Sequence, residues 1–315
     1  MTIHKCSNDN CLHRLQAIER LNPAERELQK KRSSQFKLNY QYREYHFKPE
    51  EIAHSAPDKP TVDLTRIHNS ENVLGLVLAF YVTYAVPARK TAAILRDVFR
   101  VNLSYQTVLN YAAAAAFYCH SFNLKHKGSI DSVSAGDETY IKVLGKHHYV
   151  FFFISSKSLK ITAYHLADNR GTLPAVVAMK EAIRSASADQ DLILVTDGNP
   201  SYPAGIHFLN ALDYGPAIRH KKVIGLQNLD AESEEWRALK QLVERLNRTF
   251  KYHVRPAAGF NSMNGATVLT TLFVTNYNFL RPHMSLHNLP PVQLPEIQSI
   301  STIQGKWIKI LSLAA

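Results

Sequence analysis

The stretch "SVSAGDETYIKVLGKHHYVFFFISS", residues 132–156, decides the fold that the sequence predicts. Its first half alternates polar and apolar residues, its second half is mostly apolar, and Gly145 and Lys146 provide a turn between the two. This pattern predicts a β-hairpin. The stretch "LKITAYHLA", residues 159–167, predicts a third strand, so we expect an antiparallel meander.

The sequence after the meander predicts alternating helices and strands. "TLPAVVAMKEAIRSA", residues 172–186, has a helical pattern, and "DLILVTDGNPSY", residues 191–202, is a short apolar strand that ends at an acid and a turn. An apolar strand of this kind is typical of a buried parallel strand. A further helix is predicted at "YPAGIHFLNAL", residues 202–212. The expected fold class is therefore α/β, with a mixed sheet flanked by helices.

Helices are also predicted before the meander, after a linker at residues 55–65. They cover residues 69–84, a segment that begins at Pro87, and a segment that begins at Ser104, a favourable N-cap. The apolar run 73–86 is too short to span a membrane, which needs about 20 residues, so we expect a buried helix there. Short helices joined by a few residues are typical of a helix-turn-helix, although ordinary helical packing would give the same pattern.

The first 57 residues show little periodicity. "KCSNDNC" contains a C-x4-C pair, Cys6 and Cys11, and "FKLNYQYREYHF", residues 36–47, alternates like a short hairpin strand. A zinc ribbon needs four ligands, and the second half has no cysteine. His4, His13 and His46 could complete a zinc site, or the segment could be a degenerate ribbon with ordinary thiols.

Composition narrows the class of protein. The chain has 315 residues and 45% hydrophobic content, which is enough for a sizeable core. Its formal charge of +11 indicates a polyanionic partner, and nucleic acid is the commonest one. Three cysteines and a start without an apolar signal sequence favour a reducing cytoplasm, with no membrane partner.

Two aspartates occupy informative positions in the predicted sheet. Asp137 lies inside the first strand, and Asp197 ends the buried strand "LILVT". Open α/β sheets place their ligands at the carboxyl ends of parallel strands. If the two strands are neighbours, these carboxylates face each other and could share a divalent cation. Alternatively, Asp137 is a solvated strand residue and Asp197 only begins an Asp-Gly turn.

A third acid lies on a predicted amphipathic helix, "LKQLVERLNRTFK", residues 239–251. Its polar side carries one acid, Glu244, among four basic residues: Lys240, Arg245, Arg248 and Lys251. Glu244 could simply form i to i+4 ion pairs with Lys240 and Arg248. It could also be a functional carboxylate delivered by the helix.

Several of these stretches together resemble a known family. "DETYIKVLGKHHYVFFFIS", "LVTDGNPSY", "HKKVIGL", "LKQLVERLNRTFKYHVRPAAGF" and "FVTNYNFLRPHMSL" resemble the DDE-type transposases of bacterial insertion sequences, relatives of retroviral integrases with a ribonuclease H-like core. The resemblance covers about residues 132–291. It implies a mixed five-stranded sheet and a catalytic, metal-binding triad of Asp137, Asp197 and Glu244.

The resemblance also implies a reaction and a domain plan. Two Mg²⁺ ions, for which Mn²⁺ can substitute, are expected to serve DNA cleavage and strand transfer, because two ions can clamp the attacking and leaving oxygens of a phosphodiester. The expected partners are transposon-end DNA, target DNA and further copies of the chain. The plan has a degenerate ribbon at 1–57, a helical DNA-binding domain at 58–128, a catalytic domain at 129–291 and a tail at 292–315. The missing second cysteine pair makes zinc an unexpected cofactor.

The other candidates are secondary to the triad. Glu138 is expected on the opposite strand face from Asp137, and Glu232, Glu234 and Glu235 are expected to serve the helix dipole at a helix start. The residues expected to contact DNA are Lys240, Arg248, Lys251, His220, Lys221, Lys222 and Arg170. A loop arginine such as Arg170 could equally be solvated, and Asn247 and Arg248 are expected near the metals. Two other functions stay open: an inactive DNA-binding descendant, and a nuclease without strand transfer.

Overall fold

The computed structural model describes residues 2–4, 10–31, 42–44, 54–212, 215–226 and 231–315. The chain forms two compact units, Met1–Ile52 and Ala53–Ala315. In the first unit, strands β1 (Thr2–His4) and β2 (Tyr42–Glu44) pair antiparallel, and helices α1 (Leu12–Glu19) and α2 (Pro23–Lys31) lie between them in sequence.

The two helices of the first unit did not follow from the sequence pattern. Cys6 and His46, on which the zinc hypothesis depends, lie outside the described residues, as do the side chains of His4 and His13. Nothing in the described part of this unit supports a zinc ribbon.

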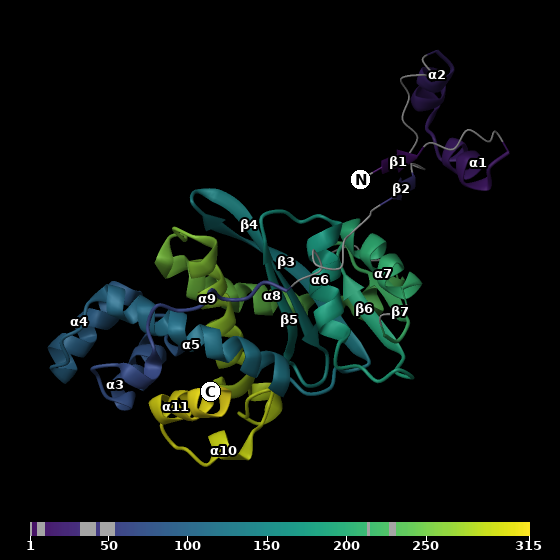
Figure 1. Cartoon of the computed structure of the whole chain (residues 1–315). Helices are drawn as coiled ribbons and strands as arrows, with labels where there is room; N and C mark the ends of the chain where they lie inside the picture. The colour runs from purple at the N-terminus through teal and green to yellow at the C-terminus, as the bar shows by residue number, and fades with distance from the viewer. Residues whose placement is uncertain (1, 5–9, 32–41, 45–53, 213–214, 227–230) are drawn as a thin grey trace. The chain divides into compact units, whose positions relative to one another are not determined.

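A five-stranded sheet forms the centre of the second unit (Figure 1). Its strands are β3 (Val133–Val143), β4 (Lys146–Ser155), β5 (Ile161–Ala167), β6 (Leu192–Thr196) and β7 (Ile218–Lys222). They lie in the order β5-β4-β3-β6-β7. The meander β3-β4-β5 is antiparallel, whereas β6 runs parallel to β3 and β7 runs parallel to β6. The predicted mixed sheet is confirmed.

The turn between β3 and β4 lies one residue earlier than the sequence suggested. Leu144 and Gly145 both have positive φ, 49° and 76°, which is typical of a two-residue turn that matches the twist of a hairpin. Gly145 adopts this conformation without strain, whereas Leu144 does not favour it. The Leu144 amide donates a hydrogen bond of 2.8 Å to the carbonyl of Phe260, which helps to hold the turn.

Helices cover both faces of the sheet. Helices α6 (Thr172–Ile183) and α7 (Ser201–Ala211) lie on one face, and α8 (Ala231–Val254) and α9 (Met263–Thr275) lie on the other (Figure 1). Strand β4 shows why its sequence is apolar on both sides. The ring of Phe152 lies 5.0 Å from Phe250 of α8, while the neighbouring rings of Phe151 and Phe153 pack against Tyr202 of α7.

The predicted helices before the sheet are confirmed. They are α3 (Glu71–Leu78), continued by the π-helical turn η3 (Ala79–Thr83), then α4 (Ala88–Phe99) and α5 (Tyr105–His126). Ser104 caps α5, because its side chain accepts a hydrogen bond of 3.0 Å from the Thr107 amide. Within the described residues, no helix is both long and apolar enough to cross a bilayer.

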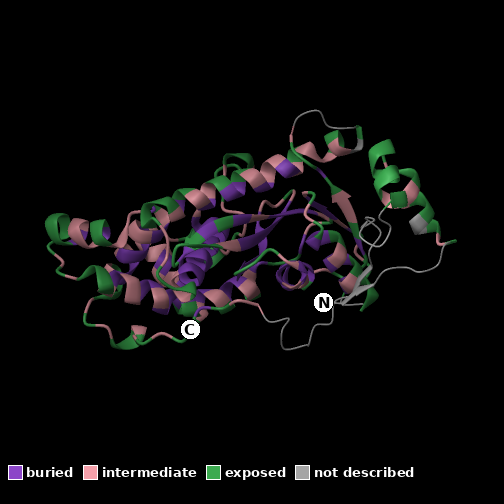
Figure 2. Ribbon diagram, turned by 90° about the horizontal axis from the view of Figure 1, so that it is seen from above, coloured by how far each residue is buried: buried purple, intermediate pink, exposed green. Residues whose placement is uncertain are grey.

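Residues 292–315, expected as a tail, form part of the helical core. Helices α10 (Pro295–Gln298) and α11 (Ile303–Ala314) follow the sheet region in sequence, and α11 packs against α3 and α5. Trp307 of α11 is fully buried in this core. Figure 2 shows the buried residues concentrated where the helices pack against one another and against the sheet. The Trp307 indole donates a hydrogen bond of 3.0 Å to the Thr83 hydroxyl. A Cβ on Gly75 would lie 2.6 Å from the Gln304 carbonyl, so only glycine allows α3 and α11 to approach this closely.

Helix α5 connects the helical region to the sheet region. The Asn123 amide donates to the Thr271 carbonyl of α9 at 3.1 Å. Just after α5, the Lys127 ammonium lies 2.7 Å from the Glu181 carboxylate of α6, and both side chains are buried. A buried ion pair of this kind holds the two regions in one arrangement, because separating the partners would leave unpaired charges in the core.

Candidate active site

Asp137 and Asp197 lie side by side because of the sheet register. Strands β3 and β6 run parallel, and Ala135 pairs with Val195. Two residues after this pair, the same register places Asp137 of β3 beside Asp197, the residue that follows β6. Asp197 follows the last residue of β6, so the pair lies at the carboxyl end of that parallel strand, where sheets of this type place their ligands.

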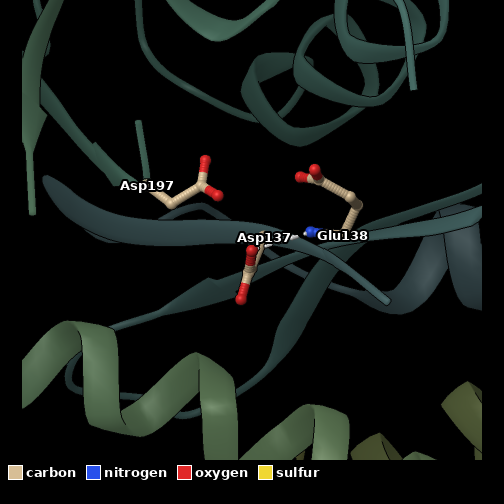
Figure 3. A group of neighbouring side chains, drawn as sticks. All are labelled: Asp137, Glu138 and Asp197. Atoms are coloured by element: carbon tan, nitrogen blue, oxygen red, sulfur yellow. Dashed lines mark hydrogen bonds between the residues drawn. The ribbon is translucent and has the colours of Figure 1, made fainter. Parts of the chain in front are cut away.

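Three acids meet at this point. One carboxylate oxygen from each of Asp137, Glu138 and Asp197 can be chosen so that all three lie within 4.8 Å of one another. Figure 3 shows the carboxylates of Glu138 and Asp197 on one side of β3 and that of Asp137 turned to the other side. Neighbouring strand residues point to opposite faces, as the sequence predicted for Glu138. The sequence did not predict that Glu138 would still join the cluster.

Glu138 is held in place by neutral donors. The Tyr202 hydroxyl donates to it at 2.6 Å and the Asn199 amide at 3.0 Å. The Arg170 guanidinium lies 3.7 Å away and remains mostly exposed, so this loop arginine lies at the acidic cluster. Burial, followed by the nearby carboxylates, raises the pKa of Tyr202 well above its usual value, so its hydroxyl stays protonated and can donate.

Asp137 faces helix α8. Its Oδ2 atom accepts hydrogen bonds from the Lys240 ammonium and the Asn247 amide, both at 3.2 Å. Burial raises the pKa of Asp137 to about 6, Lys240 opposes this shift, and the charges of Glu138 and Asp197 add to it. Lys240 was expected to contact DNA, but its side chain is buried against Asp137.

Glu244 lies one turn further along α8 and is linked to the cluster through Lys240. Its Oε1 atom is 4.0 Å from the Lys240 ammonium, and its side chain is 37% exposed. Glu244 is not among the three acids whose oxygens meet. Lys240, Glu244 and Asn247 nevertheless have the spacing of one helix face, and two of them contact Asp137.

The competing acids at the start of α8 do not approach the site in the described structure. Glu234 and Glu235 are exposed, and Glu234 forms an ion pair of 3.0 Å with Arg237. The side chain of Glu232 lies outside the described residues. Among the acids of α8 whose side chains the structure describes, Glu244 is the one with a connection to Asp137, through Lys240.

A turn fixes the position of Asp197. Its Oδ1 atom accepts a hydrogen bond of 2.9 Å from the Asn199 amide, so Asp197 does begin a turn, as one hypothesis held. The same Asn199 holds Glu138 through its side chain. Sequence reasoning missed Asn199, although an Asp two residues before a turn amide is a recognisable signal.

The other basic residues predicted to contact DNA have different surroundings. The His220 Nε2 atom lies 2.8 Å from the Thr196 hydroxyl, and burial lowers the pKa of this imidazole. Lys221 and Lys222 follow it on β7. On α8, the Lys251 ammonium lies 4.3 Å above the Tyr140 ring, and Arg248 is exposed.

These residues fit a divalent cation of the magnesium type. Carboxylate oxygens are the ligands that Mg²⁺ prefers, and three of them already lie within reach of one another. The Oδ1 atom of Asn247 is buried at the same place without a hydrogen-bond partner in the described structure, although buried amide oxygens are normally satisfied. The site therefore offers the amide oxygen of Asn247 in addition to the three carboxylates.

Comparisons with known proteins relate the segment that contains the site to a protein family. Residues 131–270 match the family model of a DDE domain, of the IS240 transposase type. A comparison with curated proteins found no match.

Three solved structures are similar to parts of the chain. The catalytic core domain of HTLV-2 integrase in complex with magnesium is 16% identical, covers 51% of this chain and 95% of its own, and has a TM-score of 0.35. A simian T-cell lymphotropic virus intasome in complex with the PP2A regulatory subunit B56 gamma is 15% identical, covers 66% of this chain and 70% of its own, and has a TM-score of 0.36. The Mos1 strand transfer complex is 12% identical, covers 82% of this chain and 88% of its own, and has a TM-score of 0.24.

Proposed function

Because residues 131–270 form a DDE transposase domain, we propose that the protein cleaves DNA at the ends of an insertion sequence and joins the freed ends to target DNA. The observation that carries the proposal is the position of Asp137, inside β3, beside Asp197 at the carboxyl end of the parallel strand β6, opposite the face of α8 that bears Glu244. Acids from separate elements are what metal-assisted phosphodiester chemistry requires.

Asp137, Asp197 and Glu244 would hold two Mg²⁺ ions, for which Mn²⁺ can substitute. When bound, such ions stabilise the charge that develops on the attacking and leaving oxygens of the phosphodiester. Asn247 orients the Asp137 carboxylate through its amide. Lys240 provides a positive charge beside Asp137, which favours the ionised form that a metal ligand needs.

The reaction has two transfers at phosphorus. In the first, a water molecule attacks a phosphodiester at the element end; the bond to the 3′-oxygen breaks and leaves a 3′-hydroxyl and a 5′-phosphate. In the second, that 3′-hydroxyl loses its proton, attacks a phosphodiester of the target and displaces the target's 3′-oxygen. Neither step forms a covalent bond to the enzyme.

DNA binding would use both parts of the second unit. Helices α4 and α5, which are joined by residues 100–104, would act as a helix-turn-helix and bind the terminal repeats. Around the active site, the expected phosphate contacts are Arg170, His220, Lys221, Lys222, Arg248 and Lys251. Two element ends must be brought together, so a dimer or higher oligomer on DNA is expected.

A strand-transfer assay with the full chain tests the proposal. The substrate is a labelled duplex that carries the inverted repeat flanking the gene, incubated with a supercoiled target plasmid and Mg²⁺. A transposase yields labelled plasmid. Cleavage without labelled plasmid would indicate a nuclease of the same fold, and binding without cleavage would indicate an inactive DNA-binding protein; either result refutes the proposal.

A further inference from the structure

A cavity lies beside the C-terminal half of α8. It has a volume of about 740 Å³ and is lined by residues of α8, by η5 (Asn276–Leu280) and the residues after it, by the end of η3 and the residue after it, and by α11. Two tyrosines and two arginines are among its lining residues: Tyr84, Arg248, Tyr252 and Arg281. We call this cavity the α8 groove.

The charge of the α8 groove is positive. Arg248 and Arg281 line it, and its lining includes no aspartate or glutamate. Neither arginine forms an ion pair with an acid in the described part of the chain, whereas several other arginines of the protein do. The Arg281 guanidinium is held 5.8 Å from the centre of the Tyr277 ring. Two guanidinium groups without a carboxylate favour an anion, and phosphate suits their planar, forked geometry.

Two tyrosine rings in the α8 groove are unusually exposed. Tyr84 is 55% exposed and Tyr252 is 64% exposed, although large aromatic residues usually bury most of their surface. The groove behind them is well ordered by hydrogen bonds. The Thr83 hydroxyl donates to the buried side chain of Asn276 at 2.8 Å and accepts from Trp307. The rings are therefore presented by a fixed surface.

The α8 groove lies close to the active site along the same helix. Arg248 and Tyr252 follow Glu244 by one and two turns, which corresponds to roughly 6 and 12 Å along the axis. These lengths are comparable to the distance between successive phosphates in an extended strand. A DNA strand whose phosphate lies at the acids can therefore place an adjacent nucleotide in the groove.

From this combination we propose that the α8 groove binds an unpaired nucleotide of the DNA substrate next to the cleavage position. Its base stacks on Tyr252 and Tyr84, and its phosphate contacts Arg248 and Arg281. In a duplex, the faces of a base are covered by its neighbours, so a ring can stack on it only when the base leaves the helix. The volume suits one nucleotide, since pockets for small ligands measure about 300–1,000 Å³. This inference rests on the proposed function, because it names the form of DNA that the active site takes.

A binding assay without divalent metal tests the inference. The full chain in EDTA is titrated against one duplex sequence in two forms, blunt or with an unpaired 3′ extension that contains 2-aminopurine. The wild type should bind the extended duplex about tenfold more tightly than the blunt one and quench 2-aminopurine, because stacking on aromatic residues contributes about this much per base. Equal affinity for the two forms would overturn the proposal.

Variants of the groove residues test whether the preference for the extended duplex arises in the α8 groove. The double variant Tyr84→Ala and Tyr252→Ala should lose the preference and the quenching, whereas Tyr84→Phe with Tyr252→Phe keeps the rings and should keep both. Arg281→Ala should weaken binding of the extended duplex. Leu212→Ala removes an exposed apolar side chain after α7, on the other face of the sheet, and should change nothing. A preference that survives the double alanine variant places the nucleotide elsewhere.

The outcome separates this inference from the proposed function. Binding is measured without metal, so it does not depend on catalysis. A protein that performs strand transfer but shows no preference for the extended duplex refutes the α8 groove alone. A protein that shows the preference but never cleaves DNA refutes the transposase activity alone.

Discussion

The Lys240 ammonium lies 3.2 Å from Oδ2 of Asp137, and both side chains are buried. Asn247 donates to the same oxygen. The lysine offsets the negative charge of an acid that is also close to Glu138 and Asp197. A divalent cation that binds Asp137 must compete with this ammonium for the same carboxylate. The ion pair therefore connects the stability of the protein with the chemistry of its active site.

We expect Lys240→Met to destabilise the protein in a pH-dependent way. The substitution leaves the Asp137 carboxylate buried without its cation, which costs about 3 kcal/mol when the carboxylate is charged. Loss of Lys240 also raises the pKa of Asp137 above about 6, so at pH 5 the carboxyl group is neutral and the cost should be small. Urea unfolding at pH 5 and pH 8 measures the difference. An equal loss at both pH values would mean that Lys240 acts through packing and not through charge.

The sequence predicted the sheet well because its signals are local. The alternation and apolar runs of β3 to β6 reflect which faces of each strand are covered, and the helix starts at Pro87 and Ser104 depend on residues close by. The closeness of Asp137 and Asp197 also followed, once β3 and β6 were assumed to be neighbours, although their carboxylates turn to opposite sides of β3 and do not face each other as expected (Figure 3). A parallel register then places equivalent positions side by side.

Tertiary contacts explain what the sequence did not predict. Lys240 belongs to the polar side of α8 in the sequence, yet it points inward because its partner, Asp137, comes from a strand far away in the chain. Trp307 finds its hydrogen-bond partner, Thr83, in the same way. A pattern of polarity gives the face of a helix but not the partner that covers it. The inclusion of Glu138 in the acidic cluster likewise depends on the position of Asp197 after β6.

We expect divalent cations to bind more weakly at low pH. Burial raises the pKa of Asp137 to about 6, so below that pH a proton occupies the carboxylate that the metal needs. From about pH 7 down to pH 5, Mn²⁺ affinity should fall by roughly a factor of ten, and binding at pH 5 should release a proton. Calorimetry of the full chain in buffers of different ionisation enthalpy measures both quantities. Affinity that is the same at pH 5 and pH 7 would exclude Asp137 as a ligand.

We expect the start of α5 to distinguish terminal-repeat DNA from other DNA. Gln106 is exposed there, and its amide donates to the Asn110 side chain at 2.9 Å. Amide side chains at the start of a recognition helix can read adenine in the major groove, and each such contact contributes about 1–3 kcal/mol. Gln106→Ala and Asn110→Ala should therefore weaken binding to the terminal repeat but not to random duplex, as measured by fluorescence anisotropy. The full chain is the right material, because α5 packs firmly against α9.

Two results would contradict the helix-turn-helix interpretation. If both variants lose affinity equally for repeat and random DNA, the two amides only position the backbone. If neither variant changes binding, α4 and α5 are ordinary packing helices, and specificity must come from another part of the chain.

The Glu244 carboxylate lies 4.0 Å from the Lys240 ammonium, and the Glu244 side chain is 37% exposed. If Glu244 is a metal ligand, Glu244→Gln keeps the shape of the side chain but removes its charge, so cleavage and strand transfer should fall by orders of magnitude while DNA binding is retained. If Glu244 is only an ion-pair partner, its loss should cost at most about 0.5 kcal/mol of stability and leave the rate nearly unchanged. Glu234→Gln is the matched control, since Glu234 lies on the same helix and pairs with Arg237 outside the cluster. A dead Glu234 variant beside an active Glu244 variant would show that another carboxylate completes the site.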